Sequence, residues 1–383
     1  MCLQRKRKNH FYELNTMKHN WEYKKLKEVC QKGSSNIQQN KIVEITGNYP
    51  VYGASGFVQN IDFYHQEKPY IGIVKDGSGV GRVNIYPAQT SLLGTMQYIL
   101  PNDKVLLGYL AYCLQSLELS KFASGAAIPH IYFRDYGESF IPLPPLPIQQ
   151  KIVAELDKVS LIIEKKKQQL KELDKLAQAI FYDMFGDPVE NEKGWEVKTM
   201  GEIGTLQRGS GLSKKDLVEN GHPCILYGQI HTRFGAFTKT HIACIPDYLV
   251  NTAKIAHTGD LIMAITSEDV EGSCKSTAWL GNYDIAIGSD AAIFRHNQNG
   301  IYISYYTKTK AFYNEKAKFA RGFKVTHIST KEIATIPIMI PPLSLQQSFA
   351  AKIEAIEKQK ELISRSIKEA QTLFDERMDY WFD

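Results

Sequence analysis

The chain lacks the features that mark membrane and secreted proteins. It has no apolar run of about eighteen residues or more, the length that a membrane-spanning helix needs. Its N-terminus begins with basic residues but has no apolar core after them, so we expect no secretory signal. Its six cysteines are scattered without a C-x-x-C pair, which is typical of reduced thiols. We therefore expect a cytoplasmic protein whose cysteines serve in packing.

Motifs of catalysis and metal binding are also lacking. There is no Gly-x-Ser-x-Gly elbow and no Asn/Asp-Pro-Pro-Tyr/Phe motif of the kind that grips a flipped base. The glycine-rich stretch DGSGVGR (76–82) has no Gly-Lys-Ser/Thr ending and is followed by strand-like sequence, which favours a tight turn or ligand-facing loop over a phosphate loop. His241 and Cys244 have a ligand-like spacing but no second pair, so we expect a structural role and no metal site.

Composition describes an ordinary globular chain. The sequence has 383 residues, 43% of them hydrophobic and 23% charged, and is long enough for two domains. Its formal net charge of +5 is only mildly basic. Such a charge is compatible with binding a polyanion and does not by itself indicate one.

An internal repeat organises the chain. The helix entry IPLPPLPIQQKI, with Pro144 and Gln149, recurs as IPPLSLQQSF at an offset of 197 residues, and the segment before it, KFASGAAIPHI, recurs at the same offset as KFARGFKVTHI. An upstream match, WEYKKLKEV from Trp21 and WEVKTMGEI from Trp195, has an offset of 174 residues. The second copy therefore carries 23 extra residues between Trp195 and Lys318. Each copy has a Trp-led start, a variable body, a shared exit segment and a proline-paired entry into a long helix.

The two proline pairs each lead into a heptad pattern. Apolar residues recur at steps of four and three, interrupted at Lys166, Lys360 and Arg377, and charged residues fill the positions between them. Each helix spans about 35 to 39 residues, or roughly 55 Å. A helix with one narrow apolar stripe requires a partner helix, and we expect the long helix of the other copy to be that partner. The predicted seam consists of Ile152, Leu156, Val159, Ile163, Leu170, Leu173, Phe349, Ile353, Ile356, Ile363, Ile367 and Phe374.

The bodies between these helices read as mixed α/β or α+β structure. Short β-like runs separated by Gly, Asp and Ser turns lie at 70–75, 83–87, 261–266 and 291–296. Shorter helices are expected at 106–118 and 304–318.

Polar and basic residues on glycine-rich loops are the candidates for binding. Arg and Lys neutralise phosphates or read guanine, and Gln reads adenine, so these are the residue types of a DNA reader. Each of them taken alone also fits an ordinary solvated side chain. The candidates are Lys41, Tyr52, Ser55, Lys75, Ser78, Arg82, Arg208, Ser213, Lys214, Lys215, Gln229, Arg233, Lys275, Arg321 and Lys324.

From Met17 onward the chain resembles the specificity subunit of Type I restriction-modification enzymes. The resemblance rests on Trp21 and Trp195, the two proline-paired helix entries, the exit segments with Gly125 and Gly322, and FGDPVENEKGWE between the halves. It implies the following division: a mobile lead (1–16), a first target recognition domain (17–143), a central spacer helix (144–185), a linker (186–194), a second recognition domain (195–340) and a C-terminal spacer helix (341–383).

In that family each recognition domain reads one half of a split DNA site, and the two helices pack antiparallel with pseudo-two-fold symmetry. The resemblance implies double-stranded DNA, methyltransferase (M) subunits and restriction (R) subunits as partners. It implies no catalysis in this chain, with S-adenosylmethionine, ATP and Mg bound by the partner subunits. Since the two recognition domains differ in sequence while the helices fix their separation, we expect an asymmetric DNA site with a non-specific spacer. Exchanging the second body should then change only one half-site.

Two other interpretations remain open. A two-headed adaptor that binds protein or carbohydrate would use the same helical frame, and it predicts no steep fall of DNA affinity with salt. An enzyme with an active site in the longer second body, centred on Asp260 and Glu268, would modify DNA without partner subunits.

Overall fold

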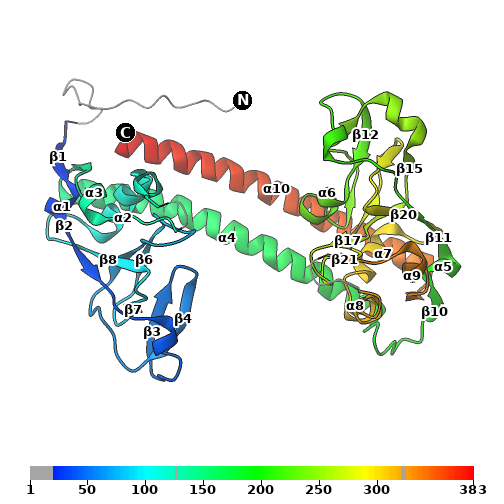
Figure 1. Ribbon diagram of the computed structural model, residues 1–383, viewed down its shortest axis with the longest axis horizontal. Coiled ribbons are helices and arrows are strands. Elements are labelled where there is room, and N and C mark those ends of the chain that lie inside the picture. The colour runs from blue at the N-terminus through cyan, green and yellow to red at the C-terminus, as the bar shows by residue number, and fades with distance from the viewer. Residues whose placement is uncertain (1–19, 126–127, 321–324) are drawn as a thin grey trace. The chain divides into compact units, whose positions relative to one another are not determined.

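The computed structural model describes residues 20–125, 128–320 and 325–383. The predicted lead (1–16), Arg321 and Lys324 lie outside these residues. The described residues up to 167, together with 365–383, form one compact unit, unit 1, and the described residues of 168–364 form a second, unit 2 (Figure 1). No helix among the described residues has the length and apolarity of a membrane span.

Unit 1 is built on a four-stranded antiparallel sheet in the order β2 (Cys30–Ser34), β8 (Met96–Pro101), β5 (Tyr70–Val74) and β6 (Val83–Tyr86). Every residue of β5 is buried, because the strand is covered on both faces. Ile71 and Ile73 pack in the same cluster as α2 (Leu107–Ser116), whereas Tyr70 and Val74 pack in a second cluster. A second sheet has the order β4 (Gly56–Ile61), β3 (Tyr49–Gly53) and β7 (Ser91–Leu92). The unit is therefore mixed α and β, as the sequence predicts.

Unit 2 repeats this topology. Its larger sheet has the order β11 (Gly204–Arg208), β20 (Ala291–His296), β16 (Leu261–Ala264), β18 (Ser276–Trp279) and β13 (Phe237–Thr238), and α7 (Gly300–Tyr306) packs on β18. Its second sheet has the order β14 (Ala243–Ile245), β12 (His222–Ile225), β19 (Ile285–Ile287) and β15 (Lys254–Ala256). The first four strands of the larger sheet correspond in order to β2, β8, β5 and β6.

The strand registers locate the extra length of the second copy. Ser34 pairs with Gln97 as Arg208 pairs with Ala292, and Val74 pairs with Met96 as Ala264 pairs with Ala291. The offset is thus 174 residues at β2/β11 and 190 at β5/β16. Most of the insertion therefore precedes β16, where unit 2 has α6 (Tyr227–Thr232), η4 (Asp247–Thr252) and the additional strands β13 and β15.

The Trp-led start and the segment before each proline pair lie side by side. In unit 1, β1 (Glu22–Lys25) pairs antiparallel with β9 (Phe140–Leu143), and in unit 2, β10 (Glu196–Thr199) pairs with β22 (Pro337–Ile340). The remaining short elements are α1 (Leu26–Val29), η1 (Gln39–Lys41), η2 (Leu119–Phe122), α3 (Phe133–Tyr136), α5 (Met200–Ile203), η3 (Lys214–Asp216), β17 (Thr266–Ser267), α8 (Lys310–Ala317), β21 (Thr326–His327) and α9 (Thr330–Ala334).

Each proline pair ends a strand and precedes a helix of 40 residues, α4 (Leu146–Phe185) and α10 (Leu343–Phe382). Both begin at the leucine after the second proline, two residues later than the predicted starts at residues 144 and 341. This difference arises because Pro144 and Pro145, like Pro341 and Pro342, connect the strand to the helix without belonging to either.

The long helices run antiparallel where they meet within each unit. In unit 1, Glu155 of α4 pairs with Arg377 of α10, and in unit 2, Asp174 pairs with Lys360 at 2.8 Å. All twelve predicted seam residues are buried or half-buried. The heptad pattern did not single out Phe181 or Met378, which are also buried. Phe181 stacks on Tyr302 and meets Phe349 edge to face.

One predicted helix is wrong as a single element. The segment 304–318 contains the end of α7 and the whole of α8, separated at Thr307 to Thr309. The Thr307 hydroxyl donates to the Ser304 carbonyl at 2.9 Å, and the Thr309 hydroxyl accepts from the Phe312 N–H at the start of α8. These local hydrogen bonds compete with those of a continuous helix. A prediction based on the apolar pattern alone does not detect them.

Candidate nucleic-acid interface

In unit 1, several loops meet at one end of the four-stranded sheet. The Arg82 guanidinium donates to the Ala54 carbonyl at 3.0 Å, which joins the β5–β6 loop to the tip of the β3–β4 hairpin. The Lys75 N–H donates to the Thr95 carbonyl at 3.0 Å and joins the same loop to the β7–β8 turn. These bonds bring the predicted residues Ser55, Lys75 and Arg82 into one region.

The shared exit segment of the repeat closes this region. The Ile131 N–H donates to the Lys75 carbonyl at 3.0 Å, and the Gly77 N–H donates to the Pro129 carbonyl at 2.9 Å. The ring Nδ1 of His130 contacts the Asp76 carboxylate. Sequence reasoning noted His130 only as part of the repeat. Its spacing to Asp76 gave no signal, because the two residues lie 54 positions apart.

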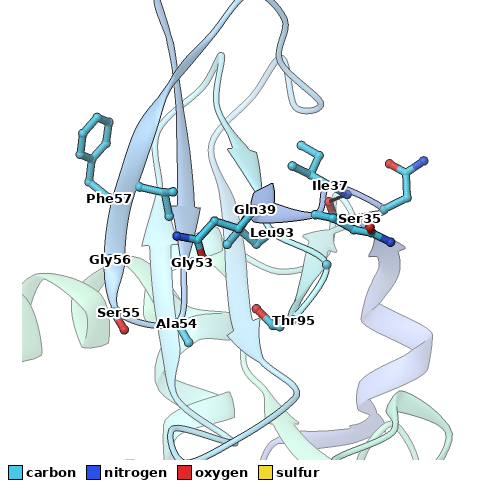
Figure 2. Close-up of a pocket in the computed structure, with 14 residues that line it drawn as sticks. Ser35, Ile37, Gln39, Gly53, Ala54, Ser55, Gly56, Phe57, Leu93 and Thr95 are labelled. Carbon is cyan, nitrogen blue, oxygen red and sulfur yellow. Dashed lines mark hydrogen bonds between the residues drawn. The ribbon is translucent and has the colours of Figure 1, made fainter. Parts of the chain in front are cut away.

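Beside these loops lies a hollow of about 840 Å³. Figure 2 shows its two walls, the segment from Ser35 to Gln39 on one side and the hairpin from Gly53 to Phe57 on the other. Leu93, Gly94 and Thr95 also line it. A Cβ at Gly53 would lie 3.0 Å from the end of the Leu93 side chain, which would have to move slightly to accept it.

The structure separates the predicted residues of unit 1 by exposure. Lys41, Ser55, Ser78 and Arg82 are exposed, whereas Lys75 is half-buried. Tyr52 is also half-buried, because its ring packs against Phe57 and Tyr86. Of these, Ser55 lines the hollow.

Unit 2 has a corresponding loop region at the end of β16. The Thr266 hydroxyl lies 3.1 Å from Nδ1 of His327 and donates to the Asp290 carboxylate at 3.3 Å. Arg208 donates to the Ser289 carbonyl at 2.8 Å. His327 follows His130 at the offset of the repeat, so each unit has a histidine from its exit segment at the equivalent end of its sheet.

Several predicted residues of unit 2 already have structural partners. The Ser213 hydroxyl bonds Asp216 at 2.9 Å, in a capping box of η3. The Gln229 side chain accepts from the Leu226 N–H at 3.1 Å. The Lys275 ammonium donates to the His231 carbonyl at 2.8 Å. The exposed candidates are Arg208, Lys214, Lys215 and Arg233.

A buried lysine that sequence reasoning missed holds the β17–β18 loop. Lys316 of α8 is 3% exposed, and its ammonium donates to the carbonyls of Glu271 and Ser273 at 2.9 and 2.6 Å. The pKa of this amine is lowered, because the effect of burial exceeds the opposing attraction of Cys274 and the nearby acidic residues. Lys316 thus fixes the loop that carries Asp269 and Lys275.

The carboxylate suggested for an active site has a structural role. Asp260 is 5% exposed, bonds Arg295 at 3.0 Å and accepts from the His257 N–H at 2.9 Å. These contacts satisfy the carboxylate, so they favour a packing role over acid–base chemistry. Glu268 is exposed in the β17–β18 region.

The histidines and cysteines of the described residues form no metal centre. No group of three or more His, Cys, Asp or Glu side chains is arranged to hold an ion in residues 20–125, 128–320 and 325–383. His241 bonds the Tyr283 hydroxyl at 2.7 Å, and Cys244 is a buried free thiol. Burial raises the pKa of Cys30, Cys224 and Cys274 to about 12, so these thiols are protonated packing groups.

The comparisons with known proteins identify the class of this two-unit fold. The family model for the Type I restriction modification DNA specificity domain matches residues 18–175 and 192–372. The chain therefore belongs to this family, with one match in each half.

Specificity subunits of other Type I systems are similar to this chain over part or nearly all of its length. The Type I restriction enzyme MjaVIII specificity subunit of Methanocaldococcus jannaschii is 24% identical over 368 residues, covering 86% of each chain. The EcoKI specificity subunit of Escherichia coli is 23% identical over 43% of this chain and 36% of its own. The S subunit of a Type I system from M. genitalium has a similar structure, with a TM-score of 0.60 at 15% identity, covering 97% of this chain and 98% of the other. The resemblance inferred from the repeat is thus confirmed, and so is the fold class.

Proposed function

We propose that this specificity subunit binds a two-part DNA site, with one half read by the loop region of each unit. The observation that carries the proposal is the repeated sheet, which presents loops of different sequence at the equivalent end of each unit. Exposed basic residues lie in both units, among them Lys41, Arg82, Lys214 and Arg233. Such side chains neutralise phosphates, while the differing loops would make the two half-sites differ.

The long helices would dock the methyltransferase subunits. Charged residues dominate the outer faces of α4 and α10, yet large apolar side chains are exposed there. Among them are Leu161, Ile162, Leu176, Leu362 and Leu373, each between 47% and 56% exposed. A contiguous exposed apolar patch marks an interaction site, and these side chains would contribute to one. In this proposal methylation and cleavage belong to the M and R subunits, which would bind S-adenosylmethionine, ATP and Mg.

The proposal is tested by mapping methylated bases in DNA treated with the complex of this chain and its M subunits. We expect a single two-part motif, and the absence of any motif would refute the proposal. Exchanging residues 195–340 for those of another specificity subunit should change one half-site and leave the other. If both half-sites change together, the assignment of one half-site to each unit is wrong.

Salt dependence separates DNA reading from the adaptor alternative. Phosphate neutralisation predicts that the logarithm of the affinity falls linearly with the logarithm of the salt concentration. An adaptor for protein or carbohydrate predicts weak DNA binding without sequence preference. The chain without partner subunits, supplied with S-adenosylmethionine and DNA, should produce no methylation, whereas an enzyme centred on Asp260 would produce it.

A further inference from the structure

The segment that forms one wall of the hollow in unit 1 has a fixed backbone. Ile37 is 6% exposed and packs in a buried cluster with Val51 and Leu93. The Gly94 N–H donates to the Ile37 carbonyl at 2.8 Å, and the Ile37 N–H donates to the Ser35 hydroxyl at 3.2 Å. The segment is therefore held in place from within, independently of the side chains on its outer side.

The outer side of this segment carries four carboxamides in five residues. Asn36, Gln38, Gln39 and Asn40 are all exposed. Within the described part of the chain, none of these four side chains makes a hydrogen bond. This distinguishes them from Gln229 and Gln149, whose amides are bound by backbone groups. A fixed backbone that presents unengaged amides is preorganised for an external partner.

One of these carboxamides, Gln39, faces the hairpin that forms the other wall of the hollow. Figure 2 shows the Gln39 side chain extending toward the hairpin, near Gly53. On the other side of the hollow, the hairpin contributes Ser55 and Phe57 to the lining, and the Phe57 side chain is 61% exposed. The Gln59 amide donates to the Ile45 carbonyl at 3.1 Å, which fixes the chain after the carboxamide segment to the same hairpin. The two walls of the hollow are thus joined by a hydrogen bond and by the shared cluster of Ile37, Val51 and Leu93.

Amide side chains recognise one base edge best. A Gln or Asn amide donates to N7 and accepts from the N6 amino group of adenine in the major groove. No phosphate-binding charge lies among residues 35–40, and the neighbouring cations Lys41 and Arg82 flank the hollow's lining segments. The amides are therefore placed to contact base edges at the hollow, and the two cations are placed to contact phosphates at its margins.

We infer that the carboxamide segment, Asn36 to Asn40, reads adenine in one half-site, with Gln38 and Gln39 as its specificity-determining side chains. The inference rests on the proposed function and deepens it, because it names the bases that unit 1 contacts.

The test uses the full chain in complex with its M subunits and a pool of duplexes with randomised half-sites. The wild-type complex defines the two-part motif. In Gln38→Ala and Gln39→Ala we expect the preference for A·T at one or more positions of a single half-site to fall on the order of ten- to hundred-fold. The other half-site should keep its preference. Gln39→Glu should shift the preference at its position from adenine toward cytosine, since a carboxylate accepts from the cytosine N4 amino group.

Two controls separate the possible outcomes. Gln115→Ala removes an exposed amide of α2 outside the hollow and should leave the motif unchanged. Lys41→Ala should weaken binding by a similar factor for all sequences. If the wild type selects a two-part motif and the Gln38 and Gln39 variants select the same motif with equal discrimination, the inference is overturned while the proposed function stands. If the wild type selects no motif, the proposed function itself falls.

Discussion

Gln149 and Gln346 make equivalent hydrogen bonds at the starts of the two long helices. Each side chain is fully buried and donates to the carbonyl of the first proline in its own proline pair, at 2.9 and 2.8 Å. Each also accepts a backbone N–H from the residue directly before a shorter helix of the same unit, α2 or α7. That N–H belongs to Leu106 in unit 1 and to Asn299 in unit 2, at 2.9 and 3.0 Å. The first glutamine of the repeated motif therefore joins the recognition body to its helix.

We expect Gln149→Leu to destabilise unit 1 by about 3 kcal/mol. The substitution keeps the volume but leaves the Leu106 N–H and the carbonyls of Lys104 and Pro144 without their partner in a buried site. Chemical denaturation of the full chain measures the effect. The neighbouring Gln150 is exposed, so Gln150→Leu is the matched control and should change the free energy of unfolding by less than about 0.5 kcal/mol. Equal effects of the two substitutions would contradict the assigned role.

Phe181→Ala should destabilise unit 2 by about 3 to 5 kcal/mol. The Phe181 ring is 2% exposed, and its centroid lies 5.8 Å from that of Tyr302 and 5.6 Å from that of Phe349. Its removal leaves a cavity where α4, α7 and α10 meet. Leu176→Ala on the same helix is the control, because Leu176 is 47% exposed. Thermal unfolding followed by circular dichroism compares the two variants, and similar melting temperatures would argue against the helix contact.

Unit 2 should lose stability between pH 6.5 and about pH 4. Burial lowers the pKa of His296 from 6.5 to about 4, so the folded state keeps the imidazole neutral. As the pH falls through this window the unfolded chain binds the proton first, and the free energy of unfolding decreases. The full effect is roughly 3 kcal/mol at 1.36 kcal/mol per pKa unit.

The variant His296→Asn isolates this contribution. An asparagine keeps an acceptor for the Gln298 N–H, which bonds Nδ1 of His296 at 3.2 Å, but does not titrate. The stability difference between wild type and variant should be constant above pH 7 and should change between pH 6.5 and 4. A difference that is independent of pH over this range would exclude His296 as the source.

Lengthening both long helices should change the spacer and nothing else. Four residues inserted after Lys167 and four after Ser364 add about 6 Å, close to two base-pair steps. Both sites are exposed and lie at the boundaries of the two units. We expect the methylated motif to keep both half-sites and to gain spacer length. A changed half-site sequence would contradict the idea that the helices set the spacing.

The repeat and the long helices could be predicted from the sequence because they depend on local signals. Proline pairs end strands and heptads specify helices, whatever the bodies contain. The candidate binding residues were harder to predict. Ser213, Gln229 and Lys275 are the right residue types on the right kind of loop, yet backbone and side-chain partners already engage them. Gln38 and Gln39 were not among the candidates, although their exposed amides are unengaged.

The sequence alone determined that this protein has two similar halves, each with a variable body and a proline-paired entry into a helix. The exit segment and the helix entry recur at one offset, and such a repeat can be recognised without knowing any contact. Only the tertiary structure decided which residues face outward at the loop ends. Asp76 and His130 meet across 54 positions, and Gln149 reaches back to Leu106 across 43. Such long-range contacts follow from sheet register and packing, which no local pattern encodes.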